Sequence, residues 1–165
     1  MSERRSPERS RVFVLGPDDD NVVTRCLDFT RSALTDWEWL PVPDDDEDAA
    51  EYAEDVLLLV SELVANARLH GGGPVSLALL RTGDGLRIEV IDRSSVLPVR
   101  RRNTHPARPG GHGLLIVERL ARRWGAEPLD GGKCVWLEVS VPATGDARPA
   151  TGDARPVTPD VSTGR

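Results

Sequence analysis

The chain has 165 residues, 39% of them hydrophobic, and a formal net charge of −6 at pH 7. This length and apolar content fit one domain with its own core, and the acidic balance argues against a general affinity for nucleic acid. No apolar run is long enough to cross a membrane, and the charged first residues have no apolar segment behind them, so neither a membrane protein nor a secretory signal is expected.

The first half of the chain is predicted to form a short strand and two helices. Residues 1–10 are expected to be disordered, and "RVFVL" (11–15) has the composition of a strand. Apolar residues then recur at helical spacing over 22–37, after helix-start signals in "GPDDDN". A second amphipathic helix is expected to begin in the acidic run 44–51, whose carboxylates favour a helix N-terminus, and to end at Gly71.

The second half is predicted to hold a hairpin, a long loop, a third helix and a last strand. "VSLALLR" and "LRIEVID" are rich in β-forming residues and flank a Gly-containing turn, which is typical of an antiparallel hairpin. No period is sustained from Arg93 to Gly111, and loops of that length in compact domains are usually functional lids or disordered. A helical face returns in "HGLLIVERLARRWG", closed by Gly125, before the strand "KCVWLEVSV". This order predicts an α+β fold with helices on one face of a mainly antiparallel sheet.

The end of the chain and its cysteines complete the domain organisation. "ATGDARP" occurs at 143–149 and again at 150–156, and a small, polar heptad of this kind cannot form a core. We therefore expect one domain over 11–142 and a flexible tail over 143–165. Cys26 and Cys134 are too few for a disulfide framework or a zinc site, and they are expected to be core thiols in a reducing cytoplasm.

A carboxylate and a carboxamide lie one turn apart on the second predicted helix. Glu62 and Asn66 have i, i+4 spacing, so they share a face at the edge of its buried side. Mg²⁺ prefers oxygen ligands and commonly shares them with phosphates, and Asn66 offers a neutral carbonyl oxygen. Glu62 is suited to act as a general base. The alternative is that both are solvated residues at the rim of an amphipathic helix.

Asp92 ends the second strand of the predicted hairpin, directly before the long loop. A carboxylate there can accept a hydrogen bond from the exocyclic amine of adenine, which is a donor. The alternative is an aspartate that starts a turn.

Glycines at 110, 111 and 113 lead into the third predicted helix. Glycine permits unusual backbone angles, and amides at a helix N-terminus attract phosphate oxygens. No Lys-Ser/Thr pair follows, so this is not the common P-loop, and a long loop rather than a strand precedes it. The alternative is a flexible hinge at the end of the loop.

Taken together, these motifs resemble a known family. "ELVANARLHG", "EVIDRSSVLPVRR" and "GGHGLLIVERLARRWG" resemble the three nucleotide boxes of the gyrase-type and histidine-kinase-type ATP-binding fold. Within that fold the chain resembles the anti-sigma-factor serine kinases of bacterial partner switching, over about 11–142. The resemblance implies a two-layer α/β sandwich with a mixed, mainly antiparallel sheet, and ATP held beneath the lid.

The same resemblance implies roles for particular residues and partners. The activity implied is phosphorylation of a serine on an anti-sigma-factor antagonist by a protein that also binds and silences a sigma factor, with a homodimer as its implied assembly. No nucleic acid or membrane partner is expected. The implied cofactors are ATP and Mg²⁺, with Asn66 as the magnesium ligand, Glu62 as the catalytic base, Asp92 as the adenine reader, and Gly111, Gly113 and Leu114 as further nucleotide-binding residues.

One departure from the family pattern keeps a second function open. Fuller members carry Asp-x-Gly-x-Gly in the second box, whereas Arg93 and Ser94 follow Asp92 here. The missing glycines favour a non-catalytic binding module that acts by sequestering a protein, while the retained Glu62 favours a kinase, because binding alone needs no base. The ATP-binding domain of a histidine kinase is a weaker third reading, since nothing upstream is long enough for a dimerisation helix pair.

Overall fold

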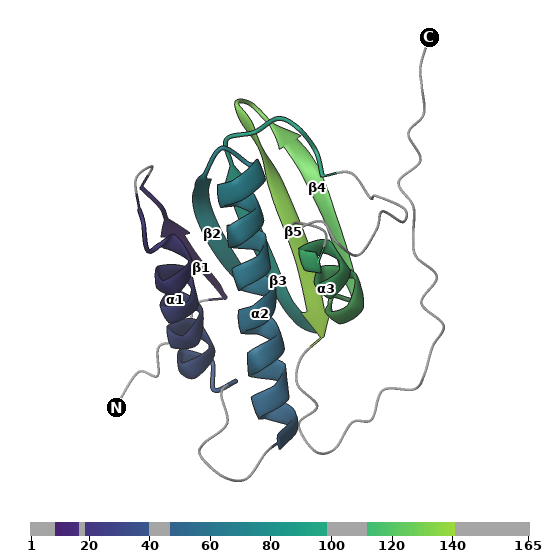
Figure 1. The fold of residues 1–165 in the computed structure, drawn as a ribbon. Helices are drawn as coiled ribbons and strands as arrows, with labels where there is room; N and C mark the ends of the chain where they lie inside the picture. Colours follow the sequence, from purple (N-terminus) through teal and green to yellow (C-terminus); the bar gives the residue numbers. More distant parts are fainter. Residues whose placement is uncertain (1–8, 17–18, 40–46, 99–111, 141–165) are drawn as a thin grey trace.

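The computed structural model describes residues 9–16, 19–39, 47–98 and 112–140. The predictions for the disordered start, for Gly111 and most of the lid loop, and for the repeated tail fall outside these ranges. None of the described helices has both the length and the apolar character needed to cross a membrane. In chain order the elements are β1 (Ser10–Val14), α1 (Val22–Asp36), α2 (Glu47–His70), β2 (Pro74–Arg81), β3 (Gly85–Asp92), α3 (His112–Leu120), β4 (Arg123–Leu129) and β5 (Gly132–Ser140), all visible in Figure 1.

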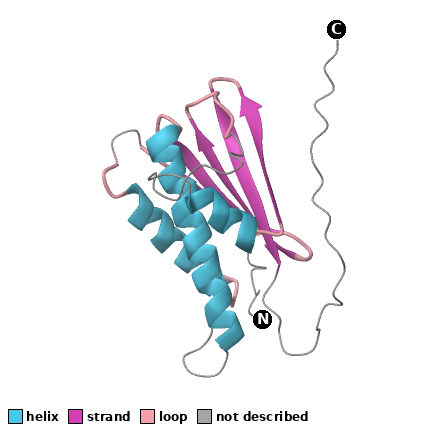
Figure 2. Cartoon of the chain, turned by 45° about the vertical axis from the view of Figure 1, so that its right-hand side comes forward, coloured by secondary structure: helices cyan, strands magenta, loops and turns pink. Residues whose placement is uncertain are grey.

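Three helices pack on one face of a five-stranded open sheet, so the predicted two-layer α+β class is confirmed. Figure 2 shows the helices gathered on one side and the sheet on the other. The strand order is β1-β2-β3-β5-β4, and the four strand pairs are all antiparallel. The described part of the sheet is therefore antiparallel throughout, without the parallel component that a mixed sheet would have.

The core lies between the sheet and α2, which runs between α1 and α3 over the middle strands (Figure 1). The apolar residues of α2 recur every three or four positions, so they form one stripe that faces the sheet. Burial of each large aliphatic side chain contributes about 1.5–3 kcal/mol to stability, and this stripe fixes the rotation of α2 about its axis. The fully buried members of this layer are Val56, Leu59, Val60 and Val64 from α2 and Leu77, Leu79, Leu86, Ile88, Val90 and Leu137 from the strands.

The predicted third helix was too long, and one strand was missed. The sequence pattern continued the helix to Trp124 and closed it at Gly125, whereas α3 ends at Leu120 and β4 begins at Arg123. β4 is an edge strand that pairs with β5 alone, and an edge strand tolerates Pro128 because one side of its backbone needs no partner. Gly125 has a packing role, because a Cβ there would lie 2.8 Å from Cζ2 of Trp136. The helical spacing over this segment was accidental.

Both cysteines are buried and free, as the sequence predicted. Burial raises the pKa of the Cys26 thiol to about 11, with a smaller contribution from the carboxylate of Asp19. Burial also raises the pKa of Cys134 to about 11, again helped by nearby carboxylates. Because the thiolate is the reactive form, both residues behave as small core side chains.

Candidate functional site

The first part of the candidate site lies on α2. Glu62 and Asn66 are both half-buried, one turn apart, because their neighbours Leu63 and Val64 point into the core. The i, i+4 spacing therefore places the carboxylate and the carboxamide at the edge of the helix, as expected.

The glycine motif at the start of α3 lies against Glu62 and Asn66 through Gly113, the second residue of that helix. It is buried, and a Cβ at this position would lie 2.4 Å from Oε2 of Glu62 and 3.3 Å from Nδ2 of Asn66. The first of these separations is too short for real atoms, so a side chain at 113 would displace the Glu62 carboxylate. A glycine allows the backbone at the start of α3 to touch both polar groups. Two motifs far apart in the sequence thus meet in one cluster, Glu62–Asn66–Gly113.

Asp92 lies at the end of β3, and its side chain is only 3% exposed. Its Oδ1 accepts a hydrogen bond from the backbone N–H of Ser94 at 2.9 Å. Nζ of Lys133 lies 3.0 Å from Oδ1 and 2.8 Å from Oδ2, so the two side chains form a buried ion pair. The carboxylate also packs against the backbone of Gly71, where a Cβ would lie 2.3 Å from Oδ2.

Gly71 joins the two parts of the site, because it follows the last residue of α2. The backbone N–H of Arg93 donates to the carbonyl of Gly71 at 2.9 Å, which ties the end of α2 to the end of β3. A helix rises about 1.5 Å per residue, so Gly71 is about 7.5 Å beyond Asn66 along the axis. The site is therefore elongated, with the Glu62–Asn66–Gly113 cluster against the C-terminal third of α2 and Asp92 just beyond the end of that helix.

Leu114 and Gly111 were also predicted to bind the nucleotide. Leu114 is half-buried and follows Gly113 in α3. Gly111 lies outside the described residues, so its role stays a prediction. The structure brings together Glu62, Asn66 and Gly113, while Asp92 belongs to the neighbouring end of the site.

Sequence reasoning missed Lys133 and the packing role of Gly71. Lys133 is the single lysine of the chain, and this was the signal available in the sequence. Its meaning depends on the register of β3 and β5, which sets Asp92 directly opposite Lys133. That register could not be read before the sheet order was known.

The described residues fit magnesium and a nucleotide at one end of the site. No group of three or more His, Cys, Asp or Glu side chains in the described ranges could hold a metal alone. A magnesium ion here would use the Asn66 oxygen together with phosphates and water, which is its common mode of binding. Because residue 113 is a glycine, no side chain at that position displaces the polar groups of Glu62 and Asn66. At the other end the fit requires a change, because Lys133 already pairs with Asp92.

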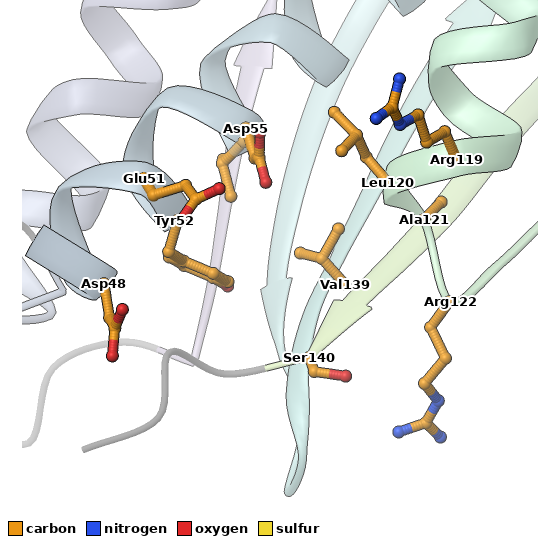
Figure 3. A pocket seen from close by; sticks show the side chains of 11 residues that line it. Asp48, Glu51, Tyr52, Asp55, Arg119, Leu120, Ala121, Arg122, Val139 and Ser140 are labelled. Atoms are coloured by element: carbon orange, nitrogen blue, oxygen red, sulfur yellow. The ribbon is translucent and has the colours of Figure 1, made fainter. Parts of the chain in front are cut away.

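A separate cavity of about 490 Å³ lies at the opposite end of α2 (Figure 3). Carboxylates of α2 line one side of it and arginines at the end of α3 the other, with Tyr52 and Val139 between them. Its carboxylates, from Asp48, Glu51 and Asp55, would repel a polyphosphate. None of the described residues that were predicted to bind the nucleotide lines this cavity.

Comparison with known proteins identifies the family and the fold. Residues 24–139 match the family described as histidine kinase-like ATPase domain. The fold is similar to the crystal structure of the RsbU and RsbW domains of Rv1364c from Mycobacterium tuberculosis, with a TM-score of 0.56 and 22% sequence identity. The match covers 83% of this chain and 33% of that one, so this chain spans about a third of its length. No curated protein sequence matches the chain.

Proposed function

The chain belongs to the histidine kinase-like ATPase domain family, and on that premise we propose that it is an ATP-binding serine protein kinase of the anti-sigma-factor type. It would phosphorylate an anti-sigma-factor antagonist and sequester a sigma factor. The observation that carries the proposal is the contact of Gly113 with Glu62 and Asn66. Phosphoryl transfer depends on metal ions and on a residue that orients the nucleophile, and a helix N-terminus favours phosphate oxygens.

Each residue of the site has a distinct task in this proposal. Asn66 would hold Mg²⁺ through its carboxamide oxygen, and the ion when bound would neutralise charge on the phosphates. Gly113 and Leu114 bring backbone N–H groups at the start of α3 toward the phosphate oxygens. Asp92 is the group that would accept a hydrogen bond from the amine of adenine, in place of its pairing with Lys133.

Glu62 acts on the protein substrate. It accepts the proton of a serine hydroxyl as the serine oxygen forms its bond to the γ-phosphorus. The bond from that phosphorus to the β–γ bridging oxygen breaks, and ADP leaves with the electron pair. The charge and the proton balance, since Glu62 ends protonated and later releases the proton to water.

A second function is favoured by the Asp92–Lys133 ion pair. A carboxylate already neutralised by a buried lysine is a weaker reader of adenine, and the glycines of the second nucleotide box are absent. The chain would then act by sequestering a protein partner without phosphoryl transfer. In either case its partners are proteins of a sigma-factor switch, and a homodimer is the assembly proposed by resemblance.

Calorimetric titration with Mg-ATP tests the proposed nucleotide site. The wild-type chain should give saturable binding, and Asn66→Ala should weaken it by at least tenfold, since the loss of one ligand bond to a charged centre costs about 1.5–3 kcal/mol. The titration requires no knowledge of the protein partner.

The matched control is Asn21→Ala, because the Asn21 side chain makes no capping hydrogen bond at the start of α1. This control should bind Mg-ATP like the wild type. Equal binding by Asn66→Ala and the wild type would remove Asn66 from the site, and no heat at millimolar Mg-ATP would favour the sequestering module.

A further inference from the structure

The most unusual polar contact in the described core is the ion pair of Asp92 with Lys133. Their side chains are 3% and 6% exposed, and Nζ lies 2.8 Å from Oδ2 and 3.0 Å from Oδ1. Nζ also donates to the backbone carbonyl of Ser94 at 3.3 Å. A lysine ammonium has three N–H donors, so three acceptors satisfy it completely. The pair is closed to solvent and has no donor left over for a ligand.

Position 133 is occupied by a lysine rather than an arginine. Lys133 is the one lysine among 21 basic residues, and the other twenty are arginines. A lysine ammonium is a compact charge with rotatable donors, whereas the arginine guanidinium is a wide, planar fork. The three acceptors around Nζ suit the compact group. The antiparallel register of β3 and β5 then fixes Lys133 opposite Asp92.

A nucleobase that binds Asp92 must therefore compete with this lysine. Oδ1 is shared between Ser94 N–H and Lys133, while Oδ2 faces Lys133 on one side and the backbone of Gly71 on another. Lys133 occupies both oxygens of a carboxylate that is only 3% exposed, so an exocyclic amine gains a full hydrogen bond only when Lys133 moves. When the binding-competent form of a site is a minor one, the apparent affinity falls by the fraction that is competent.

We propose that Lys133 is an internal competitor of the nucleobase amine for Asp92, and that it sets both the affinity and the base selectivity of the site. This inference rests on the proposed nucleotide-binding function. While Lys133 pairs with Asp92, the site gains little from an exocyclic amine on the base. When Lys133 is absent, the carboxylate is free to accept the amine, and adenine gains a charge-assisted hydrogen bond.

The test is a calorimetric comparison of wild type and Lys133→Met with two magnesium nucleotides, ATP and inosine triphosphate. Hypoxanthine carries a carbonyl oxygen where adenine carries the amine. The wild type should bind the two nucleotides within about threefold of each other, because the amine has no free acceptor. Lys133→Met should bind ATP about 10- to 100-fold more tightly than the wild type, the fold-change expected for a hydrogen bond to a charged group. Its preference for ATP over inosine triphosphate should rise to at least tenfold.

Thermal unfolding distinguishes competition from a purely structural role. Removal of Lys133 leaves a buried carboxylate without its counterion, so the ligand-free Lys133→Met protein should have a lower Tm than wild type. A structural residue would lower both Tm and affinity, whereas a competitor lowers Tm and raises affinity. Lys133→Gln is the second variant if Lys133→Met does not fold. Its neutral amide is a weaker competitor for Asp92 than the ammonium, so ATP should still bind more tightly than to the wild type, by less than with Lys133→Met.

The matched control removes a cation from another ion pair. Arg122 pairs with Asp84 at 2.5 Å on the exposed surface, and Arg122→Met should change neither affinity nor base preference. Equal or weaker ATP binding by the Lys133 variants, relative to wild type, would overturn the competition while the proposed function stands. Binding of ATP by a Lys133 variant but not by the wild type would support the competition. Absence of binding by every protein would overturn the nucleotide site and the competition together.

Discussion

Replacement of Glu62 by glutamine should lower the rate of phosphoryl transfer by about 10²–10⁴-fold, the contribution of a positioned general base. Glutamine preserves the shape of the side chain and its contact with Gly113, but it cannot accept a proton at neutral pH. Binding of Mg-ATP should stay within about threefold of wild type, because Glu62 acts on the acceptor hydroxyl rather than on the nucleotide. ADP release, with water or a protein serine as acceptor, measures the rate, and calorimetry measures the binding.

Glu54→Gln is the control for this experiment. Glu54 lies on the same helix, two turns before Glu62, and is exposed, so the change removes an equal charge without touching the site. ADP release should be unchanged. A Glu62→Gln protein that turns over as fast as the wild type would exclude Glu62 as the base. A wild type that binds ATP without any turnover would favour the sequestering module.

The second large effect is expected from Gly113→Ala, which should reduce turnover by about 10²-fold without a loss of stability. The new Cβ would lie 2.4 Å from Oε2 of Glu62, so the flexible carboxylate must move away. A misplacement of about 1 Å in a catalytic group can cost about 10²-fold in rate. Alanine also favours a helix over glycine by about 0.5–1 kcal/mol, so Tm should stay equal or rise.

Gly113→Ala should lower turnover while its Tm stays equal or rises, whereas a general loss of packing would lower both. Gly83→Ala is the matched control, because a Cβ at Gly83 meets nothing within 4 Å. It should leave turnover and Mg-ATP affinity unchanged. Turnover of Gly113→Ala within twofold of wild type would mean that the contact between α3 and Glu62 has no part in the reaction. A fall in Tm together with turnover would point to packing instead.

The long, strongly periodic elements were predictable because their patterns are local. Apolar residues every three or four positions identified α1 and α2, and the Gly-containing turn identified the β2–β3 hairpin. β4 was not predictable in this way, since Gly125 and Pro128 are poor strand residues and the preceding helical spacing ran through Trp124 by accident. Its strand conformation comes from pairing with β5, which is a tertiary interaction.

The sequence pointed to individual residues of the candidate site, but it did not predict the contacts between them. Helical spacing alone placed Glu62 and Asn66 on one face of α2, but the contact with Gly113 depends on how α3 packs against that helix. Asp92 was identified by its position at the end of a strand. Its partner Lys133 lies 41 residues away in the sequence and becomes a neighbour through the pairing of β3 with β5.

Lys133 also affects the stability of the ligand-free fold. A buried ion pair contributes little net stability relative to apolar replacements, and the loss of one partner costs about 3–5 kcal/mol. Removal of Lys133 alone should therefore destabilise the ligand-free fold at the position where the base should bind. At this end of the site, loss of Lys133 should therefore favour nucleotide binding and lower the stability of the ligand-free protein.

We propose that the Glu62–Asn66–Gly113 cluster and Asp92 form one nucleotide site along α2. Mapping the backbone amide shifts of the ¹⁵N-labelled chain by NMR during titration with Mg-ATP tests it most directly. Saturable shifts are expected at Asn66, Gly71 and Gly113, while residues around the cavity of Figure 3, such as Asp48 and Arg122, should be unaffected. Shifts confined to that cavity, or no shifts at saturating Mg-ATP, would contradict it.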